Sequence, residues 1–357
     1  MTRDYSQFLP TSAPSDAPTP PSRLQTLGWQ SFFAQQVDVD ALEATPPLRV
    51  TEVHRSGLRA LGETLDEVIP PSVEATVGDW VLFDRDLPAN SQVLQRKSLI
   101  KRRAPGHGRE VQLIAANLDT AFVVTSCNAD FNVARLERYI ALALEAEVTP
   151  VILLTKADLC DDPSAYATQA EAIVAGVAVV ALDARADTVA EVLAPWCTPG
   201  QTVAFLGSSG VGKSTLVNAL SGGERAATGG TREGDGKGRH TTTSRQLHIL
   251  AGGCAVLDTP GMRELQLTDA SGGVGEVFAD LAELAQQCKF NDCAHASEPG
   301  CAVTAALARG EIDAARLARW QKLAAEEAFN SASLAERRAK DKDFGKMVRK
   351  VIKAKKR

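Results

Sequence analysis

The segment GSSGVGKST, residues 207–215, has the G-x-x-x-x-G-K-[S/T] spacing of a phosphate-binding loop. It follows the apolar run TVAFL and opens the helix-forming run STLVNALSG, which is the context this motif requires. Glycines let the backbone amides turn toward phosphates, and a helix N-terminus adds positive potential. We expect Lys213 to bridge the β- and γ-phosphates and Ser214 to bind Mg²⁺. The predicted nucleotide contacts in this loop are Gly207, Ser208, Ser209, Gly210, Val211, Gly212, Lys213, Ser214 and Thr215.

The segment VLDTPG places Asp258 at the end of the next apolar run after the phosphate loop. A carboxylate there is expected to hold Mg²⁺, and Gly261 to offer its N–H to the γ-phosphate. Residues 221–243 between the two motifs are rich in glycine and poor in apolar side chains, which predicts a switch loop ordered by the nucleotide. A plain disordered insertion is the alternative. Among its closing threonines, Thr241 and Thr242 are the predicted nucleotide contacts, and Thr241 a predicted Mg²⁺ ligand.

Met262 follows Gly261, at the position where many GTPases carry a glutamine that orients the attacking water. A methionine side chain cannot hydrogen-bond that water usefully. We therefore expect a low intrinsic hydrolysis rate, with the missing group supplied from elsewhere. His240, beside the threonines, is the nearest candidate in the chain, and Lys213 is the other predicted catalytic residue.

The run VILLTKADL, residues 151–159, indicates a buried strand followed by a base-reading loop. Asp158 would accept hydrogen bonds from N1–H and the exocyclic amine of guanine, whereas adenine presents an acceptor at N1 and would be rejected. The stem of Lys156 would cover the base. Thr155 stands where an asparagine is usual and can make only part of that residue's contacts. The base loop precedes the phosphate loop, an order that a parallel sheet tolerates if the chain has been circularly permuted.

Three cysteines and a histidine gather in the segment CKFNDCAHASEPGC. Three thiolates and one imidazole form a closed tetrahedral ligand set, which is typical of a structural zinc site. Chance proximity of thiols and a histidine is the alternative. Such a site would leave no position for a catalytic water, so we assign it to folding. The predicted ligands of one zinc ion are Cys288, Cys293, His295 and Cys301.

Patterning along the 357 residues divides the chain into several parts. Short apolar segments separated by turns predict a small all-β module, and alternating strands and helices after it predict a doubly wound α/β domain. The later residues are largely helical. The predicted boundaries are 1–44 for a Pro-rich, largely disordered segment, 45–114 for the β-barrel, 115–275 for the α/β domain, 276–335 for the helical domain and 336–357 for a basic tail.

Charge is unevenly distributed over the chain, whose formal net charge is −5. The tail 336–357 holds eleven Lys and Arg against three Asp and Glu, and the segment RKSLIKRRAPGHGRE (96–110) reads as a second basic loop. A basic tail on an acidic body suggests a polyanionic partner such as RNA, and a merely solubilising tail is the alternative. We expect no membrane association and a cytoplasmic protein, because no apolar run approaches the length of a membrane span and the first residues lack a signal-peptide pattern.

The motif order, together with GSSGVGKST, GRHTTT, DTPG and the cysteine cluster, resembles the circularly permuted, small-subunit-dependent GTPases of the RsgA/YjeQ family. The resemblance covers about residues 48–329. It implies an N-terminal OB-fold that binds RNA, a permuted GTPase domain and a C-terminal zinc domain. It also implies a GTPase that acts in late maturation of the small ribosomal subunit, with the subunit and its rRNA as partners and as stimulators of hydrolysis. Nothing in the sequence requires more than a monomer.

Two other interpretations of the sequence remain open. One is a P-loop ATPase in which the TKAD tetrapeptide is accidental. The other is an RNA-binding zinc protein whose nucleotide is regulatory or structural.

Overall fold

The computed structural model describes residues 21–54, 56–71, 73–103, 111–221, 245–258 and 270–331. Two compact units are present, Met1–Leu265 and Gln266–Arg357, called here the first and second units. Among the described residues, none of the helices combines the length and the apolar character needed to cross a membrane.

The first unit begins with three short helical segments, α1 (Arg23–Thr26), α2 (Ser31–Ala34) and η2 (Val39–Ala41). Their apolar side chains form one cluster with Trp80 and Leu94 of the β-module; these side chains are Leu24, Leu27, Trp29, Phe33 and Leu42. The prediction that 1–44 is largely disordered is therefore wrong for residues 21–44. The low hydrophobicity that motivated it belongs to residues 9–22, whereas the next twenty residues carry enough apolar surface to pack. Residues 1–20 lie outside the described part of the chain.

Five antiparallel strands follow and form the β-module. β1 pairs with β2 and β4, β2 with β3, and β4 with β5. Trp80 and Phe83, the module's only Trp and Phe residues, are 0% and 6% exposed, so neither is available for stacking on bases. The bounds are β1 (Pro47–His54), β2 (Gly57–Leu61), β3 (Asp66–Ile69), β4 (Trp80–Leu82), η3 (Pro88–Asn90) and β5 (Gln92–Val93).

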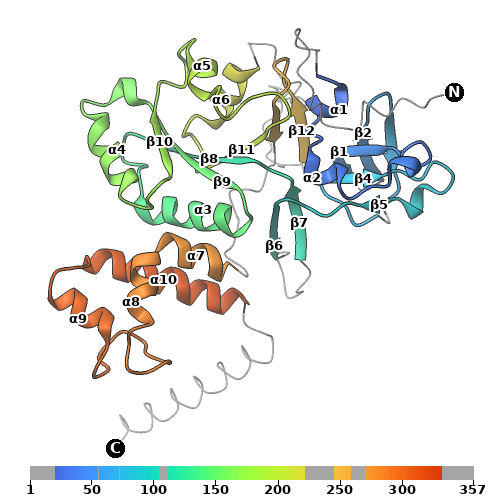
Figure 1. Ribbon diagram of the computed structural model, residues 1–357. Coiled ribbons are helices and arrows are strands. Elements are labelled where there is room, and N and C mark those ends of the chain that lie inside the picture. The colour runs from blue at the N-terminus through green and yellow to red at the C-terminus, as the bar shows by residue number, and fades with distance from the viewer. Residues whose placement is uncertain are drawn as a thin grey trace, which may run out of the picture. The chain divides into compact units, whose positions relative to one another are not determined.

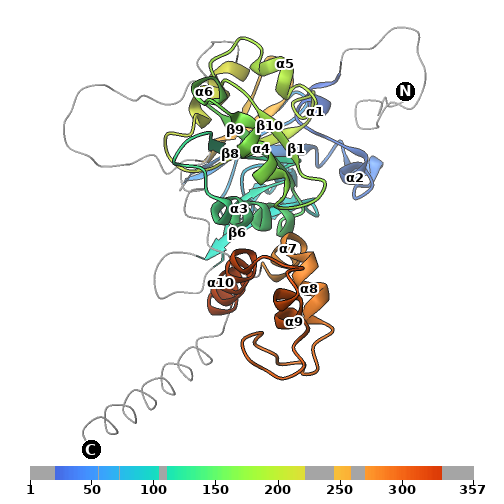
Figure 2. The ribbon, with the colours of Figure 1, turned by 90° about the vertical axis from the view of Figure 1, so that its left-hand side faces the viewer.

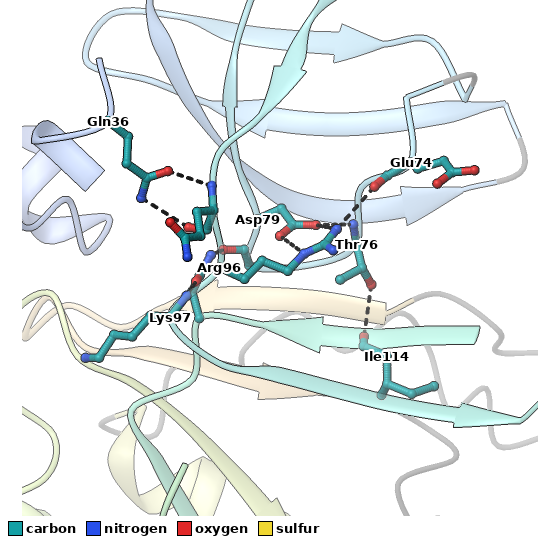
Figure 3. A network of polar contacts seen from close by, with 10 residues as sticks. Gln36, Glu74, Thr76, Asp79, Arg96, Lys97 and Ile114 are labelled. Carbon is teal, nitrogen blue, oxygen red and sulfur yellow. Dashed lines mark hydrogen bonds and ion pairs between the residues drawn. The ribbon is translucent and has the colours of Figure 1, made fainter. Parts of the chain in front are cut away.

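A separate hairpin of β6 (Leu99–Arg103) and β7 (Val111–Ala116) leads from the β-module to the α/β part. Two basic residues before it are used internally (Figure 3). Arg96 makes a two-pronged ion pair with the buried Asp79, at 2.8 and 2.9 Å. Lys97 Nζ lies 2.6 Å from Asp119, outside that view. The predicted basic loop 96–110 therefore begins with two paired side chains and a strand, β6; residues 104–110 lie outside the described chain.

The α/β part is a sheet of five parallel strands in the order β10-β9-β8-β11-β13, continued by the antiparallel β12. α3 and α4 cover one face of the sheet, and α5 and α6 cover the other (Figure 1, Figure 2). This confirms the predicted α/β organisation. The bounds are β8 (Thr120–Ser126), α3 (Val133–Glu145), β9 (Thr149–Thr155), η4 (Ala157–Leu159), α4 (Pro163–Glu171), β10 (Ala178–Ala181), α5 (Val189–Leu193), β11 (Thr202–Leu206), α6 (Lys213–Leu220), β12 (Arg245–Ile249) and β13 (Ala255–Asp258).

Helices on both faces explain why the parallel strands are apolar without alternation. Every residue of β8 is buried, as is every residue of β9 after Thr149. α3 presents Leu136, Ile140 and Ala143 to the interior, as its helical spacing predicts. The side chain of Asn132 caps this helix by accepting a hydrogen bond from the N–H of Arg135.

The β-module and the α/β sheet are joined by hydrogen bonds. β1 pairs with β12 at Glu52–Gln246 and Val53–Arg245, so one sheet runs through both parts. Beside this junction the fully buried Arg49 donates to the carbonyl oxygens of Leu27 and Asn117 and to the hydroxyl of Thr202.

The second unit contains α7 (Ser271–Val277), α8 (Ala279–Ala285), α9 (Ala302–Ala308) and α10 (Ala314–Ser331). Cys301, Val303 and Leu317 form its small buried core. Arg316 of α10 donates twice to the Asp280 carboxylate, at 2.9 and 2.8 Å. The largely helical character expected from residue 277 onward is confirmed up to residue 331, and α7 begins a few residues earlier, at Ser271.

Candidate nucleotide site and metal centre

The phosphate loop follows β11 with backbone geometry that requires its glycines. Gly207 has φ +146°, and a Cβ on it would stand 2.3 Å from the carbonyl oxygen of Val124 in β8. Gly210 and Gly212 also have positive φ, +81° and +99°. These are conformations that side-chain-bearing residues rarely adopt. The motif spacing read from the sequence thus corresponds to a compact turn packed against β8.

Lys213 begins α6, and its ammonium group folds back over the loop. It donates to the carbonyl oxygen of Gly207 over 2.8 Å and also to that of Ser208. No side chain caps the N-terminus of α6, so its first N–H groups face the space where the motif binds phosphate. Ser214 is exposed in the first turn of the helix, next to Lys213.

The base-reading segment meets the phosphate loop, although it precedes that loop in the chain and Thr155 is 56 positions from Val211. Thr155, the buried last residue of β9, places its hydroxyl 2.6 Å from the carbonyl oxygen of Val211 and 3.1 Å from that of Thr125. A hydroxyl has one hydrogen, so we assign the donation to the nearer oxygen. Lys156 follows in the left-handed region at φ +57°, and Asp158 is exposed in η4.

A third segment reaches the same end of the sheet. The residues after β10 bring the Ala184 methyl within 3.6 Å of where a Cβ on Gly212 would stand. This contact puts the segment after β10 beside the phosphate loop. The carboxyl ends of β8, β9, β10 and β11 thus gather around one site, as expected for a parallel sheet.

Sequence reasoning did not single out Asp130 or Arg135. Asp130 lies in the β8–α3 turn and accepts a hydrogen bond from the hydroxyl of Ser208 over 2.7 Å. Arg135 Nη1 donates to the same hydroxyl and to Asp130, at 2.8 and 2.9 Å. The only signal in the sequence is the place of Asp130 just after an apolar strand, which is too common to identify a site.

Several predicted switch and catalytic residues lie outside the described chain. These are His240, Thr241, Thr242 and Gly261. Asp258 closes β13, where its backbone pairs with Gln246 of β12. Its strand end therefore lies next to β11, which carries the phosphate loop.

The four predicted metal ligands come together in the second unit. Their ligand atoms all lie within 4.8 Å of one another. His295 Nδ1 is 3.6 Å from the sulfurs of both Cys288 and Cys301, and those two sulfurs are 3.8 Å apart. Cys293 is the fourth member. These residues form a compact Cys₃His set that can hold a metal ion.

The neighbours of the Cys₃His set hold its ligands in place. Glu298 accepts hydrogen bonds from the N–H groups of Ala296, Ala294 and Ser297, at 2.9, 3.0 and 3.0 Å. The N–H of Ala296, that of Glu298 itself and those of Ala294 and Ser297 lower the pKa of Glu298 to about 2. Trp320 of α10 stacks on the His295 ring, with centroids 5.3 Å apart. Neither residue was recognised in the sequence, because the spacing of ligands says nothing of what supports them.

One ligand has a shifted acidity that favours metal binding. Burial raises the pKa of Cys301, but the hydroxyl and N–H of Thr304, the His295 ring and Cys293 together lower it to about 6. The N–H of Thr304 lies 3.4 Å from the Cys301 sulfur, at the start of α9. The lowered pKa of Cys301 favours its thiolate, the form that binds metals. At Cys293 a hydrogen bond from the backbone of His295 lowers the pKa, but burial and the sulfurs of Cys301 and Cys288 outweigh it and raise the pKa to about 11.

Comparison with known proteins relates the whole arrangement to one family. A family model described as RsgA GTPase matches residues 93–268. The small ribosomal subunit biogenesis GTPase RsgA of Mesorhizobium japonicum is 52% identical over 316 residues, covering 86% of this chain and 91% of that protein. The small ribosomal subunit biogenesis GTPase RsgA 2 of Vibrio parahaemolyticus is 48% identical over 332 residues, 92% of each chain.

Solved structures agree with the sequence relatives. The crystal structure of YjeQ from Thermotoga maritima aligns with a TM-score of 0.56 at 26% identity, over 78% of this chain and 96% of that one. YloQ, described as a circularly permuted GTPase, aligns with a TM-score of 0.55 at 23% identity, over 81% and 97%, and supports the fold. With the permuted base and phosphate loops meeting in one site, these matches show that the chain belongs to the RsgA family of GTPases.

Proposed function

We propose that this protein hydrolyses GTP to GDP and phosphate, binds the small ribosomal subunit, and acts in late maturation of that subunit. In this proposal the subunit stimulates hydrolysis, and hydrolysis releases the protein. The contact between Thr155 and Val211 carries the GTPase assignment, because it joins a base-reading segment to a phosphate loop in one site. The names of the relatives carry the assignment of the partner.

Guanine selection is assigned to Asp158, with the Lys156 stem over the base and Thr155 at the base of the loop. The phosphates are assigned to residues 207–215, with the Lys213 ammonium placed beside the loop carbonyls. Ser214, Thr241 and Asp258 would hold Mg²⁺, which supplies positive charge to the phosphates when bound. Thr242 and Gly261 would contact the γ-phosphate side, and His240 would orient the attacking water.

The Cys₃His set is proposed to hold one structural zinc ion. Zinc–sulfur bonds of about 2.3 Å and zinc–nitrogen bonds of about 2.0–2.1 Å in a tetrahedron give edges of about 3.8 Å between sulfurs and about 3.6 Å between sulfur and nitrogen. The separations of Cys288, Cys301 and His295 match these edges. Four protein ligands leave no open position, which favours a role in folding.

RNA contact is proposed for the β-module, as an OB-fold, and for the basic tail 336–357. Because Trp80 and Phe83 are buried, phosphate and shape contacts would dominate over base stacking. The protein would act as a monomer in the cytoplasm, where its ribosomal partner is found.

The decisive experiment measures GTP turnover with and without purified small ribosomal subunits. We expect slow turnover alone and a marked increase with subunits, and no turnover for Lys213→Ala. Equal turnover with and without subunits would contradict the proposed partner. Competition of GTP binding by ADP as strongly as by GDP would instead indicate an ATPase. Normal release of Lys213→Ala from subunits would indicate an RNA-binding protein whose nucleotide is structural.

A further inference from the structure

Asp130, Ser208 and Arg135 form a closed ring of hydrogen bonds at the edge of the phosphate loop. The Ser208 hydroxyl donates to Asp130 Oδ2 over 2.7 Å. The Arg135 guanidinium donates to that hydroxyl over 2.8 Å and to Asp130 Oδ1 over 2.9 Å. Each group in the ring therefore has a partner of matching hydrogen-bonding role, and the β8–α3 turn is tied to the loop that follows β11.

Ser208 is tied at two points. Its side chain belongs to the ring, and its carbonyl oxygen accepts the ammonium group of Lys213. The hydroxymethyl group and the carbonyl carbon are bonded to the same Cα, so fixing the side chain restricts the orientation of the carbonyl. The preceding peptide is also restricted, because Gly207 packs against the backbone of Val124 in β8. The ring thus holds one of the two oxygens on which Lys213 rests.

The Asp130 carboxylate is also within reach of the charge of Lys156 in the base-reading segment. Burial would raise its pKa, but the Ser208 hydroxyl, Arg135 and the charge of Lys156 outweigh this and hold the pKa below its ordinary value. Asp130 is therefore ionised at neutral pH.

The ring contributes little to the stability of the fold. The Arg135 and Asp130 side chains are 37% and 32% exposed, and ion pairs this accessible to water contribute little to folding. The ring has a second effect, because it holds Ser208, whose carbonyl oxygen accepts a hydrogen bond from Lys213.

We propose that Asp130, together with Arg135, is a positioning residue for GTP binding: the ring fixes Ser208 and so places the Lys213 ammonium for the β- and γ-phosphates. This inference rests on the proposed function, since it assumes that the loop binds GTP.

The test measures binding of GDP and GMP to the full-length protein carrying Ser208→Ala, Asp130→Asn, or both. Each single change should weaken GDP binding about tenfold, as removal of a hydrogen bond to a charged group does. The double variant should be no weaker than the poorer single variant, because both remove the same ring. GMP binding should be unchanged, because Lys213 is expected to reach the β- and γ-phosphates, which GMP lacks.

Two controls separate positioning from folding. Ser208→Thr keeps the hydroxyl and should bind GDP like the wild type. Ser331→Ala removes a serine hydroxyl that donates to a carboxylate, that of Glu327, in the second unit, and should leave GDP binding unchanged. Melting temperatures without nucleotide should differ little among the variants.

Ser208→Ala or Asp130→Asn binding GDP as tightly as the wild type would overturn the inference. Equal weakening of GMP binding and GDP binding would contradict the proposal that the ring acts by placing Lys213. Should Ser208→Ala fail to fold, Asp130→Asn, which lies outside the loop, gives the same answer. Failure of the wild type to bind GDP would overturn the proposed function itself, and this inference with it.

Discussion

The hydroxyl of Thr155 donates to the carbonyl oxygen of Val211 over 2.6 Å, which joins the end of β9 to the phosphate loop. The asparagine that is usual at this position can tie to the loop and also donate to the base. The threonine hydroxyl makes the tie, but its single hydrogen is then used. Thr155 therefore keeps the tie between the base-reading segment and the phosphate loop, and its side chain has no further hydrogen to donate to a base.

Removing the hydroxyl should weaken nucleotide binding. Thr155→Val keeps the side-chain shape but leaves the carbonyl oxygen of Val211 without this donor, at a cost of about 1–3 kcal/mol. We expect about tenfold weaker GDP binding, measured by equilibrium titration with a fluorescent GDP analogue.

Thr155→Ser and Thr155→Asn provide the matched comparisons. The serine variant keeps the donor and should bind like the wild type, whereas asparagine adds a donor to the base and should bind GDP more tightly. Unchanged GDP affinity in the valine variant would show that the Thr155–Val211 bond has no part in binding.

Base preference should change with Asp158→Asn. A carboxylate accepts the two N–H groups of guanine, whereas an amide also offers a donor that matches the carbonyl oxygen of xanthine. We expect GTP binding to fall at least about 100-fold, because polar groups are left unpaired, and XTP binding to rise. Competition assays with both nucleotides check this. Asp161→Asn, an exposed neighbour, is the control; a GTP loss of equal size there would remove the assignment of Asp158.

Metal content should depend on the loop that Glu298 organises as well as on the ligands. Glu298→Gln replaces three hydrogen bonds to a charged acceptor by weaker ones, so we expect zinc affinity to fall about 10–100-fold, as for other residues that support ligands. Elemental analysis after dialysis against a graded chelator series measures it.

Cys293→Ser should lose zinc altogether, and Cys160→Ser, a half-buried thiol outside the cluster, should retain it. Zinc retention by Cys293→Ser equal to that of the wild type would contradict the assigned ligand set.

The second unit should show an acid-dependent stability that involves Asp280. Burial raises the pKa of this carboxyl group, but the hydrogen bonds and the charge of Arg316 lower it by more. The net pKa is therefore below the ordinary value of 3.8. A carboxylate with a lowered pKa stabilises the folded state above its unfolded pKa and loses that effect as the pH falls through the folded value. Asp280→Asn should therefore unfold more easily than the wild type at pH 7, and the difference should vanish below the lowered pKa. Denaturant titrations across pH 2–7 would detect it; a constant difference would exclude a titrating Asp280.

Local chemistry made the phosphate loop, the base-reading loop and the metal quartet predictable from the sequence. Gly207 and Gly212 are required by their own backbone angles, and four ligands within a short segment can close on a metal without distant help. The apolar strands and the buried face of α3 were predictable for a similar reason, because periodicity reports which residues are covered.

Only the tertiary structure decided the contacts made across long sequence separations. Strand order brought Thr155 to Val211 and Asp130 to Ser208, and it committed Arg96 and Lys97 to buried or half-buried carboxylates instead of a solvent-facing basic loop. It also packed residues 21–44 onto Trp80. A hydrogen bond or packing contact depends on which element lies alongside, and the sequence of one element does not state its neighbour. The sequence thus determined which chemical groups are present, and the order of strands in the sheet determined which of them meet.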